Sequence, residues 1–261
     1  MNTMVLNTET SAKAARVRVS GIPVTQCREA DVLNGMNENI YGERSPQYIV
    51  ITNTESMYYA KRLQEHAEFI EQAAFSCCDG VGVVLAGRTQ GVSVNRIYGS
   101  ALVKGACEFG ARHGWKHFFY GGRPGVAETM SQNLEARFPG MRTAGIYSPP
   151  FRTLSADEDE QVVQMINQSN CDVVWVGLGL LKQERWIAAH LGRIRAPWMV
   201  GVGAAFDYHA GTVKRAPLWL QRVGFEWLLR VFHEPRMLVR NYRSFVFLGE
   251  SLWTGRQWRS S

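Results

Sequence analysis

Asp79 is the residue of this chain whose position best suits acid–base chemistry. It ends the apolar run FSCCD and is followed by Gly80 and Gly82. A carboxylate at the end of a buried strand, with backbone freedom beyond it, can act as a general base. By spacing alone, an aspartate that caps the next turn is the simpler interpretation. A second observation is therefore needed to choose between the two.

Two further segments have residue types suited to binding. The segment HFFYGGRPG, residues 117–125, predicts a strand, a glycine turn and a helix that starts near Pro124. The free N–H groups of such a helix start attract phosphate, although this segment alone is weak evidence. Gln183 carries amide donors and an acceptor, which suit a sugar hydroxyl or amide, or else the first turn of a helix.

Three motifs that suggest a metal or a dinucleotide are better explained by structure. Asp157 and Asp159 spell Asp-x-Asp, but Ser155 and Glu158 form a capping box that predicts a helix start. His113 and His117 are separated by Gly114, with no acidic ligand nearby in sequence, so a zinc site is not expected. The chain has Gly-x-Gly at 201–203 but no complete dinucleotide or P-loop motif, so neither NAD nor ATP is expected and no cofactor is predicted.

The elements that must position these residues alternate between short apolar runs and amphipathic segments. Strands are predicted at 48–52, 75–79, 117–122, 142–147, 171–179 and 197–203, with helices between them. This alternation predicts an α/β fold, a Rossmann-like parallel sheet with helices on both faces. Glycine pairs at 80/82, 121/122, 177/179 and 201/203 fall at strand ends. In such sheets, ligands bind at the carboxyl ends of the strands.

The chain changes character after Pro217, where only helices are predicted. Seven apolar residues fall on one helical face: Trp219, Leu220, Val223, Trp227, Leu228, Val231 and Phe232. A second helix, after Pro235, carries Arg236, Arg240 and Arg243 as one stripe of like charge, which indicates an anionic partner or a solvated face. We therefore divide the chain into a flexible leader (1–15), an α/β core (16–212) and a helical, basic and aromatic C-terminal appendage (213–261).

Charge and cysteine usage narrow the class of protein. Residues 185–261 carry 12 Lys and Arg against 4 Asp and Glu, whereas residues 1–184 carry 17 against 19. A basic C-terminal part suits anionic lipid, a phosphorylated substrate or nucleic acid. The five cysteines form no Cys-x-x-Cys pair and indicate a reduced, cytosolic protein. Without a signal peptide or a long apolar run, any membrane contact is expected to be peripheral.

The order of several blocks in this chain resembles the WecG/TagA/CpsF glycosyltransferases, also called glycosyltransferase family 26. The blocks are Gly-x-Gly at 177–179, Lys182-Gln183-Glu184-x-Trp186, Gly201-x-Gly203, Phe206-Asp207, Ala210-Gly211, Arg215-Ala216-Pro217, Gly224-x-Glu226-Trp227 and Glu234-Pro235. The resemblance covers about residues 48–245. It implies that Asp79, in Asp-Gly-x-Gly, is the catalytic base.

The resemblance also implies a set of substrate-binding residues. Asn53 and Glu55 match the family's Thr-x-Asn-x-Glu, but the family threonine falls on Ile51, and Thr52 or Thr54 could replace it. Ala101 stands where the family usually has Asp, and Leu180-Leu181 stands where a small residue and proline are usual. The remaining matches are Arg96, for which a surface ion pair is the alternative, Gln183, the nucleotide-pocket neighbours Gly122 and Arg123, and the appendage arginines Arg230, Arg236 and Arg240.

The implied activity is inverting, metal-independent transfer from a UDP-sugar to a polyprenyl-diphosphate-linked saccharide, in cell-envelope polysaccharide or exopolysaccharide synthesis. The donor is of the N-acetylmannosamine type or another hexose such as glucose. The implied place is the cytoplasmic face of the cell membrane, with Trp219, Trp227 and Phe232 as anchors. The alternative is a non-catalytic peripheral membrane or assembly protein that binds anionic lipid. Nucleic acid is not the expected partner, and a homo-oligomer is left open.

Overall fold

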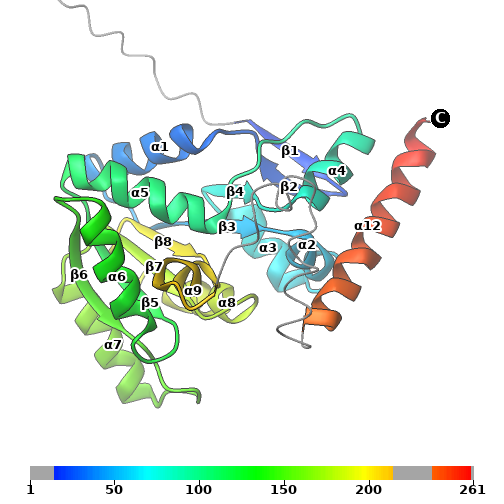
Figure 1. The fold of residues 1–261 in the computed structure, drawn as a ribbon. Helices are drawn as coiled ribbons and strands as arrows, with labels where there is room; N and C mark the ends of the chain where they lie inside the picture. Colours follow the sequence, from blue (N-terminus) through cyan, green and yellow to red (C-terminus); the bar gives the residue numbers. More distant parts are fainter. Residues whose placement is uncertain (1–14, 214–236, 260–261) are drawn as a thin grey trace, which may run out of the picture.

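The protein is built on one six-stranded parallel sheet. The computed structural model describes residues 15–213 and 237–259 (Figure 1). The strand order is β4-β3-β8-β7-β5-β6, and each neighbouring pair is parallel. The strands are β3 (Gln47–Thr52), β4 (Phe75–Cys78), β5 (Lys116–Gly121), β6 (Arg142–Tyr147), β7 (Val173–Gly177) and β8 (Trp198–Gly201). All six strands predicted from the sequence are confirmed.

Helices cover both faces of this sheet, as the strand–helix alternation predicts. The first core cluster lies under α1 (Glu29–Tyr41), α5 (Gly99–His113), α6 (Val126–Arg137) and α9 (Ala205–Ala210). The second lies under α2 (Thr54–Ala60), α3 (Gln64–Gln72), α4 (Val81–Thr89), α7 (Ala156–Gln168) and α8 (Lys182–His190). Central strands read as continuous apolar runs because both of their faces are buried.

The sheet has a switch point, a place where two neighbouring strands lead into helices on opposite faces. The chain leaves β3 into α2 on one face, whereas it leaves the neighbouring strand β8 into α9 on the opposite face. These two exits lie side by side at the carboxyl edge of the sheet and lead in opposite directions. Ligands of doubly wound sheets bind at such a point. The same divergence recurs between β5, which leads into α6, and β7, which leads into α8.

Two elements at the start of the chain were not predicted. Residues Arg16–Val19 (β1) and Ile22–Thr25 (β2) form an antiparallel hairpin that packs beside β4, where the Thr25 hydroxyl accepts a hydrogen bond from Ser76 N at 2.9 Å. The strands are only four residues long, although Arg16 and Arg18 alternate with Val17 and Val19 and Ser20-Gly21 forms the turn, which is a hairpin pattern. Both strands lie in the segment assigned to the α/β core, 16–212.

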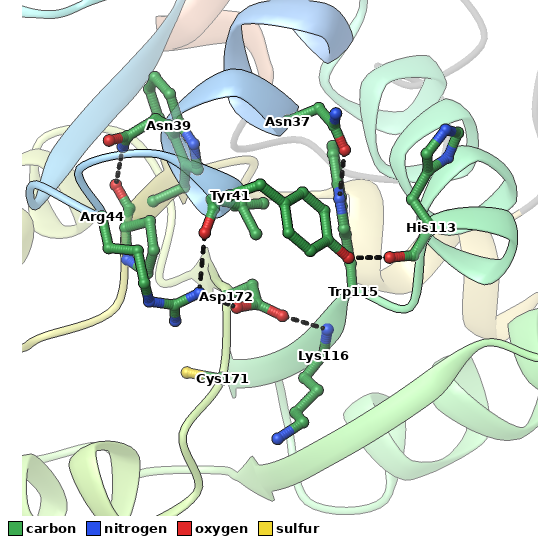
Figure 2. A network of polar contacts seen from close by, with 12 residues as sticks. Asn37, Asn39, Tyr41, Arg44, His113, Trp115, Lys116, Cys171 and Asp172 are labelled. Atoms are coloured by element: carbon green, nitrogen blue, oxygen red, sulfur yellow. Dashed lines mark hydrogen bonds and ion pairs between the residues drawn. The ribbon is translucent and has the colours of Figure 1, made fainter.

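The amino edge of the sheet is closed by a polar network (Figure 2). Asp172, which precedes β7 and is 7% exposed, accepts hydrogen bonds from Lys116 N at 2.8 Å and from the Arg44 guanidinium at 2.9 Å. Trp115 Nε1 donates to Asn37 Oδ1 at 3.1 Å, and the Tyr41 hydroxyl donates to the His113 carbonyl. These contacts join the starts of β5 and β7 to the end of α1.

The last described helix, α12 (Met237–Arg259), lies against the core beside α2 and α4 (Figure 1). Phe247 is 0% exposed and belongs to the second core cluster. Lys61 and Arg62 of the α2 end pair with Glu250, and Ser251 shares a hydrogen bond with Ser20 at 2.8 Å. The described part of the appendage is thus docked on the core.

Candidate functional site

Asp79 lies at the tip of β4, beside the end of β3. Its backbone N–H donates to the Thr52 carbonyl at 2.8 Å, so the two strand ends are held together. Gly80 follows with φ +101°, a conformation that favours glycine, and a Cβ there would have nothing within 4 Å. The half-buried Asp79 side chain therefore stands at a strand end with open space beyond the next residue.

Thr52 and Asn53, the two substrate-binding candidates on β3, have partners within the protein. Thr52 is fully buried and its hydroxyl donates to the Cys77 carbonyl at 3.0 Å. The Asn53 side chain accepts from Ser56 N at 2.9 Å and so caps α2. Asn53 Oδ1 is engaged in this cap, and an amide nitrogen has two further N–H bonds to offer.

Arg96 belongs to the same corner of the molecule. Residues 96 and 97 run parallel to the end of β4, with a bridge between Cys78 and Arg96 and a 2.7 Å hydrogen bond from Ile97 N to the Cys78 carbonyl. Burial and, to a lesser degree, the nearby Asp79 charge raise the pKa of the Cys78 thiol to about 12, while Arg96 acts in the opposite direction. The charges of Arg96 and Asp79 therefore both lie close enough to the Cys78 thiol to shift its pKa, in opposite directions.

Gln183 lies at the exit of β8, next to β3. Its Oε1 accepts a hydrogen bond from Gly203 N at 3.0 Å, and its Nε2 donates to Glu184 Oε1 at 3.0 Å. The amide packs on Gly201, where a Cβ would come within 2.9 Å of Nε2. Gln183 thus reaches across to a neighbouring strand end, whereas the alternative interpretation from sequence kept its hydrogen bonds within the first turn of its own helix.

The turn before Gln183 is strained. Leu181, the N-cap of α8, has φ +67°, which is unusual for a residue other than glycine, asparagine or aspartate. Proline, whose φ is fixed near about −65°, could not adopt this conformation. This chain has Leu181 where the family usually has proline, and its turn has a backbone conformation that proline could not adopt.

Gly122 and Arg123 lie further along the same edge, at the exit of β5. Gly122 N donates to the Gly177 carbonyl at 3.1 Å. Gly121 has φ +124°, and a Cβ there would meet the Gly177 carbonyl oxygen at 2.6 Å, so only glycine fits. The exposed Arg123 pairs with Asp207 of α9 at 3.3 Å. The helix start predicted at Pro124 is at Val126.

The C-terminal helix lies beside the ends of β3 and β4, a region that we call the Asp79 corner and that comprises residues 52–55 and 79–82. Ser244 shares a 2.8 Å hydrogen bond with the Thr54 hydroxyl, and Arg243 pairs with Glu55 at 3.1 Å. A Cβ on Gly82 would meet Thr54 Cγ2 at 2.4 Å and would be in van der Waals contact with Leu248 of α12 at 3.4 Å. Helix α12 therefore contacts both segments that leave β3 and β4, the Asn53–Glu55 motif and the turn after Asp79.

The candidate residues of the appendage lie mostly outside the described residues. This is so for Arg230 and Arg236 and for the anchors Trp219, Trp227 and Phe232. Arg240 belongs to α12, four residues before Ser244, but its side chain is not described. The third arginine of the predicted stripe, Arg243, pairs with buried Glu55 and also lies over the Tyr59 ring at 5.0 Å.

The motifs assigned to structure have structural roles here. Ser155 and Glu158 form the predicted capping box at the start of α7, and Asp159 pairs with Arg193 and His190. His117 is fully buried and accepts from Trp175 Nε1 at 3.2 Å; burial lowers its pKa to about 4. Among the described residues, no group of three or more His, Cys, Asp or Glu could hold a metal ion.

Two residues of the site were named within motifs but were given no role from the sequence. Glu55 is 7% exposed and receives Arg243 of α12, and Glu184 is 4% exposed beside Gln183. Burial raises the pKa of Glu184 to about 7, while the Gln183 amide and the nearby N–H groups of Glu184 and Leu181 act in the opposite direction. Both glutamates belong to the motifs that carry the family resemblance, which is the sequence evidence that could have identified them.

Known proteins match most of this chain. The model of the glycosyl transferase WecG/TagA/CpsF family matches residues 17–260. A relative from Staphylococcus aureus strain MW2 is 32% identical over 194 residues, 74% of each chain, and is named N-acetylglucosaminyldiphosphoundecaprenol N-acetyl-beta-D-mannosaminyltransferase. A relative from S. aureus strain NCTC 8325 / PS 47 has the same name, identity and coverage.

Proposed function

Since the chain belongs to the WecG/TagA/CpsF family of glycosyl transferases, we propose that it transfers a sugar from a UDP-sugar to a polyprenyl-diphosphate-linked saccharide, with inversion at the anomeric carbon. The observation that supports this most is the gathering of Asp79, Asn53 and Gln183 at the exits of β4, β3 and β8, next to the switch point. The product would enter cell-envelope polysaccharide or exopolysaccharide synthesis.

In the proposed reaction, Asp79 is the general base. Its carboxylate takes the proton of the acceptor hydroxyl while that oxygen forms a bond to the anomeric carbon. The bond from this carbon to the diphosphate breaks on the opposite face, and its electron pair leaves with UDP. A single displacement of this kind inverts the anomeric carbon and needs one base.

The leaving diphosphate gains negative charge that the protein must stabilise. In the proposal, this is done without a metal ion by the N–H groups near Gly122, by Arg123 and Arg96, and by Arg230, Arg236 and Arg240 of the appendage. The docking of α12 beside Asn53–Glu55 supports the part assigned to Arg240, because it brings the backbone of that helix to the Asp79 corner.

The names of the S. aureus relatives support an acceptor in which N-acetylglucosamine is linked to undecaprenyl diphosphate and a donor of the N-acetylmannosamine type. Ile51 and Ala101 depart from the family pattern, so another hexose, such as glucose, remains a candidate donor in the proposal. Both candidate replacements for the family threonine have partners within the protein, since Thr52 donates to a carbonyl of β4 and the Thr54 hydroxyl donates to Ser244 of α12, so the proposal keeps both.

Peripheral contact with the cytoplasmic face of the membrane follows from the lipid-linked acceptor. The face of α12 away from the core carries exposed apolar side chains, Tyr242, Phe245, Leu252 and Trp253. An amphipathic helix with aromatic residues on one face suits the membrane–water interface. No helix within the described residues is long and apolar enough to cross a membrane.

A transfer assay tests the proposed function. Purified protein is incubated with one UDP-sugar at a time and a short-chain polyprenyl-diphosphate N-acetylglucosamine acceptor, and the product is identified by mass spectrometry. We expect one added sugar with the opposite anomeric configuration and release of UDP. Absence of product with every UDP-hexose and UDP-N-acetylhexosamine would contradict the proposal.

Thermal unfolding separates the proposal from a non-catalytic protein that binds anionic lipid. UDP at about 100 times its Kd should stabilise the transferase by about 2.7 kcal/mol, because it binds the folded state. NAD and RNA should leave the midpoint unchanged. Stabilisation by anionic vesicles without any effect of UDP would favour the lipid-binding protein.

A further inference from the structure

Glu184 is buried at the carboxyl edge of the sheet with only part of its hydrogen-bonding capacity used. It is 4% exposed, and its Oε1 accepts from Gln183 Nε2 at 3.0 Å. Its Oε2 has no hydrogen-bond partner within the part of the chain that the structure describes. Buried carboxyl groups normally have partners for both oxygens, so this arrangement calls for an explanation other than stability.

The Gln183 amide between Glu184 and the β8 exit can have only one orientation. Gly203 N–H can donate only to the amide oxygen, and a carboxylate can accept only from the amide nitrogen. Turning the amide over would bring two donors together at Gly203 and two acceptors together at Glu184. The two contacts therefore exclude the flipped form.

The position of Gln183 is fixed as well as its orientation. The amide lies against Gly201, which leaves no room for a side chain on that strand. One Nε2–H bond goes to Glu184, and the second remains to be used by a group outside this pair. This second N–H belongs to a side chain at the exit of β8, which adjoins β3 at the switch point.

The same turn has other features that do not favour stability. Leu181 is held at φ +67°, and Gly179 at φ +85°. A buried carboxyl, a strained turn and a glycine within six residues are typical of a site shaped for a ligand. A salt bridge or a second hydrogen bond at Glu184 would have made the turn more stable.

We propose that Glu184 is a positioning residue: it holds the Gln183 amide in one orientation, so that the second Nε2–H bond of Gln183 is presented to a hydroxyl or amide oxygen of the donor sugar. This inference rests on the proposed function, because it assumes a nucleotide-sugar at the switch point. Glu184 acts through Gln183 and does not itself touch the sugar.

A double-mutant cycle tests the coupling between the two residues. Gln183→Ala should raise the KM for the UDP-sugar about tenfold, the scale of one lost hydrogen bond. Glu184→Ala should raise it by a similar factor, with the acceptor KM unchanged. The double variant should be no worse than Gln183→Ala, because Glu184 has nothing left to position.

Three further variants serve as controls. Glu184→Gln keeps a carbonyl acceptor for Gln183 Nε2 and should stay within about threefold of the wild-type KM. Arg185→Ala changes the neighbouring exposed residue of α8, which pairs with Glu65, and should have no kinetic effect. The exchange of both residues, Gln183→Glu with Glu184→Gln, restores a donor–acceptor contact but removes the N–H offered to the sugar. It should recover the melting temperature and not the donor KM.

The outcomes distinguish the possible errors. Multiplicative effects of Gln183→Ala and Glu184→Ala on the donor KM would show that Glu184 acts independently and would overturn the inference. A wild-type donor KM in the exchanged double variant would also overturn it, and this test remains available if Glu184→Ala does not fold. A wild-type protein that transfers no sugar from any UDP donor would instead refute the proposed function.

Discussion

The two edges of the central sheet use polar groups in opposite ways. At the amino edge, Asp172 has a partner for each carboxylate oxygen, one from Lys116 N and one from Arg44 (Figure 2). At the carboxyl edge, Glu184 has a partner for only one oxygen within the described residues, and its pKa is raised to about 7 by burial. Both carboxyl groups are at least nine-tenths buried, so burial alone does not explain the difference.

Positive φ occurs at both edges of the sheet, at Arg44, Gly114 and Asn170 before the strands and at four glycines after them. The strand exits at the carboxyl edge require glycine with positive φ at Gly80, Gly121, Gly179 and Gly203. A ligand or a neighbouring backbone can approach closely at such positions. We infer that the amino edge stabilises the fold, whereas the carboxyl edge gives up stability to present groups to a substrate.

The largest effect on stability that we expect from this comparison is the pH dependence of Glu184. Its folded pKa is about 7 against an ordinary value of 4.5, so its contribution is fully present below about pH 4.5 and is lost as the pH rises through 7. As the pH rises from about 4.5 to about 7, the free energy of unfolding of the wild type should fall by about 3 kcal/mol relative to that of Glu184→Gln, whose side chain does not titrate.

Urea unfolding of the wild type and Glu184→Gln at pH 5 and pH 8 measures this difference directly. Other titrating groups are common to both proteins and cancel. A difference between the two proteins that is the same at both pH values would show that Glu184 ionises normally and would weaken the contrast between the edges.

A smaller effect is expected at the amino edge. Asp172→Ala removes two hydrogen bonds and leaves Lys116 N without its acceptor, which should lower the free energy of unfolding by about 2 kcal/mol. Asp172→Asn, which keeps one acceptor oxygen, should lose less. Transfer per folded molecule should be unchanged in both variants. A selective loss of turnover at constant stability would place function at the amino edge too.

The docking of α12 on the carboxyl edge should depend modestly on Arg243. Arg243→Gln weakens the ion pair to Glu55, which is 7% exposed, and should lower stability by about 1 kcal/mol. The matched change Arg185→Gln removes an exposed pair with Glu65 and should be close to neutral. Equal effects of the two substitutions in urea unfolding would argue that α12 does not use Arg243 to dock.

The smallest effect is expected from metal removal. Asp157, Glu158 and Asp159 form the start of α7, and Glu158 and Asp159 pair with Arg152, Arg193 and His190. Transfer should therefore persist in EDTA, and Asp157→Ala should change turnover by less than about twofold. Loss of activity in EDTA that manganese or magnesium restores would revive a metal-binding Asp-x-Asp motif.

The sequence predicted the sheet because its strands are short apolar runs separated by amphipathic helices, a pattern set by local residue order. It did not predict the β1–β2 hairpin, whose strands are only four residues long, although Arg16 and Arg18 alternate with valines as in a half-buried strand. The burial of Glu184 was also not predicted. A glutamate in KQERW reads as an ordinary helix residue, whereas in the fold it is 4% exposed and accepts a hydrogen bond from Gln183.

The row of arginines in the appendage also shows that the sequence did not identify contacts between residues far apart in the chain. Arg236, Arg240 and Arg243 share one face by spacing, and the sequence indicated an anionic partner or solvent for all three. For Arg243 the anionic partner is a side chain of the protein itself, Glu55, which is 188 residues away in the chain. The roles of Arg236 and Arg240 stay predictions, as do those of Asp79 and the other site residues.

The turnover of Asp79→Asn is the most direct test of the account. The substitution keeps the shape of the side chain and removes the base, so transfer should fall by about 10² to 10⁴-fold while the melting temperature and the stabilisation by UDP stay at wild-type values. Wild-type turnover in the purified Asp79→Asn protein would contradict the assignment of the carboxyl edge as the catalytic site.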